Sequence, residues 1–84
     1  MKERAAKRKP AKETLRANIK DYIQKQIASG VYRPGDRIVE TQLAREMNVS
    51  QAPVREAILE LVSLGLLEER PYSGHMVRQM GPAE

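Results

Sequence analysis

Several residue types that build reactive sites are missing or rare in this chain of 84 residues. It has no cysteine, which excludes disulfides and thiolate metal sites. Its single histidine, His75, argues against a metal cluster and against a catalytic triad that depends on histidine. Phenylalanine and tryptophan are absent, so the chain lacks the aromatic platforms on which single-stranded bases stack. We therefore expect no cofactor and no enzymatic activity.

The chain also lacks a long hydrophobic run. None approaches the roughly 20 residues that cross a bilayer, and the basic N-terminus is not followed by the apolar stretch of a secretory signal. A chain of this size buries only about 60–65% of its unfolded surface, which leaves little room for a deep catalytic cleft. We expect one small domain in the reducing cytoplasm, without a membrane partner.

Charge is unevenly distributed along the sequence. The formal net charge is +4, but residues 1–20 hold eight basic and two acidic residues, whereas residues 21–84 hold seven basic and nine acidic ones. Residues 1–13 have no apolar period and contain Pro10, so they are predicted to form a disordered basic arm. The arm either lies along DNA phosphates or a minor groove, or it is only a solvated tail. Residues 81–84 are interpreted as a linker or a truncated end.

Apolar residues at spacings of three and four predict a first helix over residues 14–29. Thr14 is a candidate N-cap, and Gly30 stands where a glycine often follows a helix. Pro34 and Gly35 are typical of the two central positions of a type II turn, because the second needs a positive φ. Ile38 is expected at the centre of a very short strand. The apolar residues of the helix are Leu15, Ile19, Tyr22, Ile23 and Ile27.

A second helix is predicted from about residue 40 or 41 to Met47, and Asn48 is expected to end it in the left-handed conformation. Val49 is expected to point into the core. A third helix begins after Ser50, whose hydroxyl we expect to cap the Ala52 amide, since Pro53 has no N–H. A break of about three residues between two helices is the length of a helix-turn-helix turn. The third helix buries Val54, Ala57, Ile58, Leu61 and Val62 and is stopped by Gly65.

Two strands with a turn between them follow the third helix. Residues 66–70 and 75–80 are predicted strands, and residues 71–74 have the composition of a turn. The sequence therefore predicts a mainly α fold with a small β-hairpin, which is a winged helix-turn-helix of three helices and a short antiparallel wing. We expect the domain to span residues 14–80, with the helix-turn-helix at about 40–59 and the wing at about 66–79.

The third helix is the candidate recognition helix, whose first residues approach base edges in the major groove. Gln51 suits adenine N6 and N7, and Ala52 suits a thymine methyl. Arg55 lies one turn beyond Gln51 and suits either a phosphate or guanine O6 and N7. Taken alone, Gln51 is equally a solvated first-turn residue. Arg55 is equally half of a surface pair with a nearby carboxylate such as Glu56 or Glu60.

Further contacts are expected beside the recognition helix. Thr41 has a hydroxyl suited to a phosphate, or caps the second helix, and Arg45 is a weaker phosphate candidate. At the wing tip, glycine lets the backbone approach a sugar-phosphate edge, or the wing is only a solvent-exposed hairpin. The wing-tip candidates are Tyr72, Ser73 and Gly74, and His75 and Arg78 are candidates for additional contacts.

Residues 49–57, which read VSQAPVREA, resemble the recognition segment of GntR-type bacterial transcription regulators. The resemblance extends to residues 27–38, to Gly65-Leu66-Leu67-Glu68, to Gly74 and to Val77, and its spacing is similar to that of the subgroup with the fatty-acid-responsive regulator. The family implies a dimeric regulator on a palindromic operator and, in a longer parent protein, a C-terminal domain that binds an effector. Its DNA contacts correspond here to Thr41, Ser50, Gln51, Ala52, Pro53, Arg55 and the wing around Gly74, while Arg37 supports the fold or a phosphate contact.

The recognition segment departs from the family pattern at two positions. The family often has arginine where this chain has Gln51, and threonine where it has Ala52. We therefore expect adenine at the base that faces Gln51, with a preference of about 1–3 kcal/mol. The leading hypothesis is sequence-specific binding of duplex DNA by a metabolite-responsive transcription regulator. The alternative is a winged-helix module that docks on a protein, which the acidic balance of residues 21–84 favours.

Overall fold

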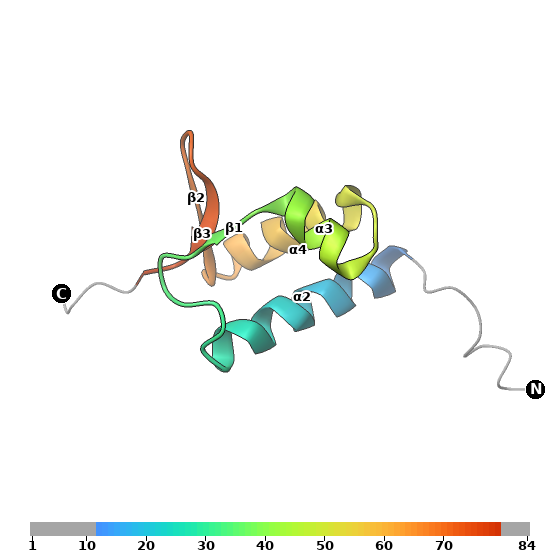
Figure 1. The fold of residues 1–84 in the computed structure, drawn as a ribbon, viewed down its shortest axis with the longest axis horizontal. Coiled ribbons are helices and arrows are strands. Elements are labelled where there is room, and N and C mark those ends of the chain that lie inside the picture. The colour runs from blue at the N-terminus through green and yellow to red at the C-terminus, as the bar shows by residue number, and fades with distance from the viewer. Residues whose placement is uncertain (1–11, 80–84) are drawn as a thin grey trace, which may run out of the picture.

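The computed structural model describes residues 12–79, which form three helices and a three-stranded sheet (Figure 1). Along the chain these are α2 (Lys12–Ala28), β1 (Arg37–Ile38), α3 (Glu40–Met47), α4 (Gln51–Ser63), β2 (Leu67–Arg70) and β3 (Gly74–Val77). The predicted fold class is confirmed. The predictions for residues 1–11 and 80–84, namely the greater part of the basic arm and the linker, lie outside the described residues.

Helix α2 follows the predicted apolar pattern but begins earlier than predicted. It starts at Lys12 rather than Thr14, so Thr14 lies inside the helix and is not its N-cap. Ile19 and Ile23 are fully buried, because their spacing of four places them on one face. The helix ends one residue before the predicted Ser29, and Gly30 follows with φ +86° and donates its N–H to the Ile27 carbonyl at 3.1 Å.

The predicted type II turn leads from α2 to the sheet. Gly35 has φ +91°, and the Asp36 N–H donates to the Arg33 carbonyl at 2.9 Å, which closes the turn. The Asp36 carboxylate accepts a second bond from the Arg33 amide at 2.8 Å. This turn delivers Arg37 and Ile38 to the edge of the sheet as the short strand β1, as the sequence predicts.

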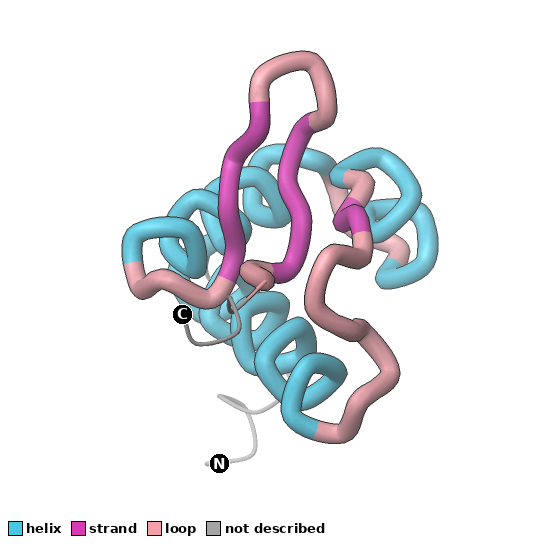
Figure 2. The backbone as a smooth tube through the Cα atoms, turned by 90° about the vertical axis from the view of Figure 1, so that its left-hand side faces the viewer, coloured by secondary structure: helices cyan, strands magenta, loops and turns pink. Residues whose placement is uncertain are grey.

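The sheet is antiparallel with the strand order β1-β3-β2, so β3 lies in the middle (Figure 2). Ile38 of β1 stands opposite His75, and Leu67 of β2 stands opposite Val77. Leu67 and Val77 are buried and join the hairpin to the helical core. Both strands are shorter than predicted, since β2 begins at Leu67 instead of residue 66 and β3 covers Gly74–Val77 instead of residues 75–80.

Helix α4 is the centre of the core. Its fully buried side chains recur every three or four residues, and each of the larger ones, Val54, Ile58 and Leu61, contributes about 1.5–3 kcal/mol by leaving water. They pack between α2, α3 and the sheet. Val62, which was also predicted on this face, is only partly buried. Besides Pro53, the buried apolar residues of α4 are Val54, Ala57, Ile58 and Leu61.

Ion pairs fasten the outer sides of α2 and α4 to each other. Lys20 Nζ lies 3.0 Å from a Glu60 carboxylate oxygen, and Arg16 Nε lies 3.8 Å from the other oxygen of Glu60. Arg16 also approaches Glu56, with 3.7 Å between Nη1 and Oε1. These pairs are partly exposed, so each contributes no more than about 1 kcal/mol. They mark the side of α4 that faces α2, and the opposite side remains open.

Candidate nucleic-acid interface

The turn between α3 and α4 has the predicted length and conformation. Asn48, Val49 and Ser50 separate the two helices. Asn48 adopts φ 59° and ψ 48°, a left-handed conformation that asparagine tolerates better than most residues. The Val49 N–H donates to the Ala44 carbonyl at 3.0 Å, and the Val49 side chain packs against the core. The tight turn thereby fixes the direction in which α4 leaves α3.

Ser50 occupies the N-cap position of α4 but does not cap it with its side chain. Its backbone is extended, with φ −77° and ψ 169°, and its hydroxyl makes no capping hydrogen bond. The predicted bond from the Ala52 amide to this hydroxyl is therefore wrong. Pro53 lacks an N–H, but the Ser50 hydroxyl does not accept from the neighbouring Ala52 amide in its place. The hydroxyl of the exposed Ser50 remains available to an external partner.

The first turn of α4 presents Gln51 and Ala52 to solvent, and Arg55 follows one turn later on the same side. Pro53 differs from them, because its ring is buried against the core. A buried ring cannot reach a base edge, so the structure limits Pro53 to shaping the start of the helix. The remaining predicted residues of this helix form one exposed surface, which we call the recognition surface and define as Ser50, Gln51, Ala52 and Arg55.

Arg55 is engaged by a carboxylate that the sequence did not indicate. Its Nε and Nη2 donate to the two carboxylate oxygens of Glu40, at 3.1 and 3.0 Å. The hydrogen bonds to Glu40, and after them its negative charge, raise the pKa of Arg55 above its ordinary value. The predicted alternative was an ion pair with Glu56 or Glu60. Arg55 does form an ion pair, but with Glu40. Those two acids face α2 and pair there with Arg16 and Lys20.

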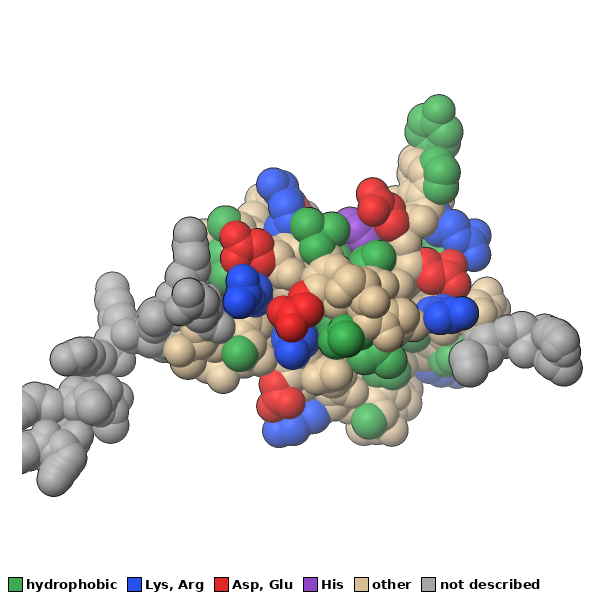
Figure 3. Space-filling view, turned by 180° about the vertical axis from the view of Figure 1, so that it is seen from behind, with side chains coloured by type: hydrophobic (Ala, Val, Ile, Leu, Met, Phe, Trp, Pro, Cys, Tyr) green, Lys and Arg blue, Asp and Glu red, His purple; other side chains and the backbone are tan. Residues whose placement is uncertain are grey.

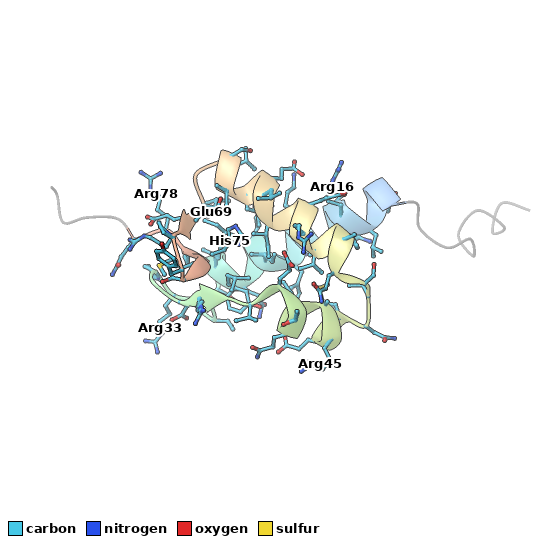
Figure 4. The ribbon with its side chains drawn as sticks, turned by 90° about the horizontal axis from the view of Figure 1, so that it is seen from above. Arg16, Arg33, Arg45, Glu69, His75 and Arg78 are labelled. Carbon is cyan, nitrogen blue, oxygen red and sulfur yellow. The ribbon has the colours of Figure 1, made fainter. Side chains whose placement is uncertain are left out.

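Helix α3 adds an exposed hydroxyl and an exposed cation beside the recognition surface. Thr41 is the second residue of α3, and its N-cap is Val39, which has no side-chain capping bond. The alternative that Thr41 caps this helix is therefore wrong. Arg45 is exposed in the last turn and forms no ion pair with another described side chain. Figure 4 shows Arg45 on α3, on the opposite side of the molecule from Arg16 of α2.

The wing projects from the body of the molecule (Figure 1). Tyr72 at its tip is fully exposed and has φ +65°, and the Ser73 N–H closes the turn by donating to the Arg70 carbonyl at 3.1 Å. Arg37 of β1 donates its Nε to the Ser73 carbonyl at 2.9 Å. Arg37 therefore supports the fold by bracing the wing tip against β1, which was one of its two predicted roles. Gly74 follows with open space around it.

His75 lies in the returning strand, as predicted, and not at the wing tip. It is in β3, opposite Glu69 of β2 and Ile38 of β1, and is only partly exposed. Its Nε2 atom is buried and has no hydrogen-bond partner among the described residues. Figure 4 shows Glu69 and His75 close together at the wing end. Arg78 is exposed beyond the strand, where its guanidinium lies 3.5 Å from the Gly65 carbonyl.

A hollow of about 250 Å³ lies between the wing and the start of α3. It is open to solvent, and both the wing tip and the first residue of α3 contribute to its lining. Its lining includes Glu40, which is also the partner of Arg55, and Arg37, which braces the wing. The other lining residues are Ile38, Val39, Ser73, Gly74 and His75.

Charges of both signs are interspersed over the described part of the chain. On the face that Figure 3 shows, blue and red side chains alternate, and hydrophobic atoms form the tip of the projecting hairpin. Among the described residues, no group of three or more His, Asp or Glu side chains is arranged to hold a metal ion. No described helix has the length and apolarity to cross a membrane. On this face the surface therefore presents single charges of both signs and not one large patch of a single sign.

Comparison with known proteins matches most of this chain to one family. Residues 15–77 match the family described as bacterial regulatory proteins, gntR family. The chain is 38% identical over 76 residues to a protein of Paenarthrobacter nicotinovorans named as a probable D-xylose utilization operon transcriptional repressor. That match covers 90% of this chain and 34% of the relative. The chain spans between 26% and 34% of the length of three such curated relatives.

Solved structures share the fold. Escherichia coli McbR/YncC superposes with a TM-score of 0.75 at 32% identity, over 82% of this chain and 32% of that one. A GntR family member from Pseudomonas syringae pv. tomato superposes with a TM-score of 0.75 at 28% identity, over 86% of this chain and 30% of that one. These similarities do not test the resemblance to the fatty-acid-responsive subgroup, which stays a prediction.

Proposed function

This chain belongs to the GntR family of bacterial regulatory proteins, and we propose that it binds a specific sequence of duplex DNA and thereby regulates transcription. One observation carries the proposal most directly. The recognition surface is exposed at the start of α4, behind a helix-turn-helix turn and beside a projecting wing. A helix start of this kind fits the major groove, and its free N–H groups favour phosphate.

Each part of the surface has a proposed role. Gln51 pairs with adenine and Ala52 contacts a thymine methyl, while Arg55 takes a phosphate or guanine. Ser50, Thr41 and Arg45 bind phosphates and fix the register of the protein on the duplex. The wing residues Tyr72, Ser73 and Gly74 lie against the sugar-phosphate edge of the adjacent minor groove. The partly buried His75 supports the wing in this scheme rather than contacting DNA.

The activity of a whole regulator is a further part of the proposal. Because this chain matches only about a third of the length of such relatives, we infer that a further segment of such a protein dimerises it and binds a metabolite. Two copies then occupy the two halves of a palindromic operator in the cytoplasm. The relative with the D-xylose name is called a repressor, and we propose repression for this chain too.

A salt titration tests the proposal against docking on a protein. Residues 21–84 carry two more acidic than basic residues, and Arg55 is already paired, which favours the protein-docking alternative. Phosphate contacts make log affinity fall with log salt by about 0.9 per contact. We expect that slope together with discrimination between a selected duplex and its scrambled sequence. Equal affinity for both duplexes at every salt concentration would leave only non-specific attraction and would reject sequence-specific binding.

A further inference from the structure

We propose that Glu40 is a positioning residue that makes Arg55 a reader of guanine and not a phosphate clamp, a role that rests on the proposed function. The two side chains come from α3 and α4, the two helices of the helix-turn-helix, and are 15 residues apart. Both carboxylate oxygens of Glu40 accept from Arg55, at 3.1 Å from Nε and 3.0 Å from Nη2. The guanidinium is therefore held in one plane before any ligand arrives.

The geometry leaves one useful edge of the guanidinium free. Arginine has five N–H donors in a rigid fork, and Glu40 occupies the edge formed by Nε and Nη2. The edge formed by Nη1 and Nη2 still offers two parallel donors, which match the paired acceptors O6 and N7 of guanine. The Arg55 side chain is 59% exposed but that of Glu40 only 21%. The carboxylate is thus the more buried partner, and the guanidinium is the one exposed to a ligand.

Electrostatics favour a base over a phosphate as the target of this pair. The Glu40 carboxylate compensates the positive charge of Arg55, and a phosphate on the free edge would meet a second negative charge close behind it. The acceptors of guanine carry no net charge, so a base edge avoids this repulsion. Arg45, which has no ion pair with another described side chain, retains its full charge. The phosphate role accordingly falls to Arg45, and the base-reading role to Arg55.

Stability alone does not account for the pair. An ion pair whose cation is this exposed contributes little to folding, because water screens it and two side chains lose freedom. Its benefit is realised on binding, since an arginine that is already oriented loses less entropy when it engages a base. Glu40 also faces the hollow between α3 and the wing. It therefore lies inside the proposed contact surface and not on a remote side of the molecule.

The first step of the test selects binding sites for the full chain from a library of randomised duplexes. An enriched motif supports the proposed function, and absence of any enrichment rejects that function before Glu40 is considered. The affinity of the full chain is then measured for the enriched duplex and for each single base-pair change in it. The same set is repeated with Arg55→Ala, which identifies the position that Arg55 reads.

We expect Arg55→Ala to abolish a guanine preference at one position, of roughly 5- to 150-fold, with the salt slope unchanged. Glu40→Gln should weaken the same preference several-fold, because the neutral amide cannot hold both donors. It should also steepen the salt slope by up to about 0.9, since the released guanidinium becomes free to bind a phosphate. In the Arg55→Ala background, Glu40→Gln should have no further effect on base preference.

Glu46→Gln is the matched control, because it removes the same charge from the same helix. Among the described residues, the hydrogen-bond partner of Glu46 is Gln42, at 3.5 Å, and not Arg55. The control should leave the guanine preference intact. Thermal melting of each variant checks that it folds, and the preference of a folded variant decides the matter. Three results would overturn the inference: a full guanine preference in Glu40→Gln, an equal loss at all bases with a shallower salt slope in Arg55→Ala, or a Glu40 effect that persists without Arg55.

Discussion

Replacing Ser50 by alanine separates the folding role of this residue from its binding role. Serine at an N-cap usually contributes about 0.5–2 kcal/mol, through a hydrogen bond from its oxygen to a helix amide. Ser50 stands at the N-cap of α4 but makes no such bond. The substitution has no capping bond to remove, so we expect the free energy of unfolding to fall by less than about 0.5 kcal/mol. In a domain of this size that corresponds to a melting temperature lowered by at most about 2–4 °C.

The same variant should bind DNA less tightly if the free hydroxyl donates to a phosphate. A hydrogen bond to a charged group contributes about 1.5–3 kcal/mol, so its removal should lower the affinity roughly 10- to 150-fold. The slope of log affinity against log salt should stay the same, because a neutral donor releases no counterion. Arg45→Ala provides the contrast, since loss of one charged contact reduces the slope by about 0.9.

Ser63→Ala is the matched control for Ser50→Ala. Ser63 lies at the other end of α4, where its hydroxyl donates to the Glu60 carbonyl at 2.8 Å. It removes the same group from the same helix, so its DNA affinity should equal that of the unchanged chain. A melting temperature lowered by more than about 4 °C in Ser50→Ala would show that the hydroxyl caps α4 in solution. An unchanged affinity would remove Ser50 from the contact surface.

Three further predictions follow from the core, the turn and a tyrosine. Ile58→Ala should lower the free energy of unfolding by about 2–5 kcal/mol in urea titration, because Ile58 is fully buried; a loss below 1 kcal/mol would contradict the packing. Asn48→Gly should be tolerated, but Asn48→Val should cost at least about 1–2 kcal/mol at φ 59°, and equal melting of the two variants would contradict this. Burial, followed by the charge of Tyr22, raises the pKa of Tyr32 to about 12 from 10.0. Stability should therefore fall as pH rises from 10 to about 12, and Tyr32→Phe should remove that part of the fall; an identical profile would refute the shift.

Local chemistry made much of the fold predictable. Asn48 and Gly35 both adopt the positive φ that their residue types and neighbours indicated. The buried faces of α2 and α4 follow the spacing of their apolar residues, because a helix places residues three and four apart on one side. These predictions needed only neighbours in the sequence. The hairpin was predicted for the same reason, since the turn at residues 71–73 is determined by residues that are adjacent in the sequence.

Contacts between distant segments were not predictable in the same way. No sequence pattern predicts that Glu40 pairs with Arg55, which is 15 residues away. Nor does a pattern predict that Glu56 and Glu60 face α2 instead. His75 was predicted in the returning strand and as an additional DNA contact, but the pairing of β1 with β3 was not predicted, and in the structure the His75 Nε2 atom is buried. Ser50 has the residue type of a cap without its hydrogen bond. Each error arose where tertiary packing decides which partner a polar group meets.

The way the charges are paired explains how an acidic surplus in residues 21–84 remains compatible with a DNA surface. The carboxylates of α4 are compensated by α2, and the carboxylate at the start of α3 is compensated by Arg55. A phosphate backbone that approaches the recognition surface therefore meets little unpaired negative charge. We therefore expect Arg16→Gln, which leaves Glu56 unpaired, to weaken binding to specific and scrambled duplexes by the same factor. Loss of discrimination alone would show that Arg16 acts on the orientation of α4 and not on the field around it.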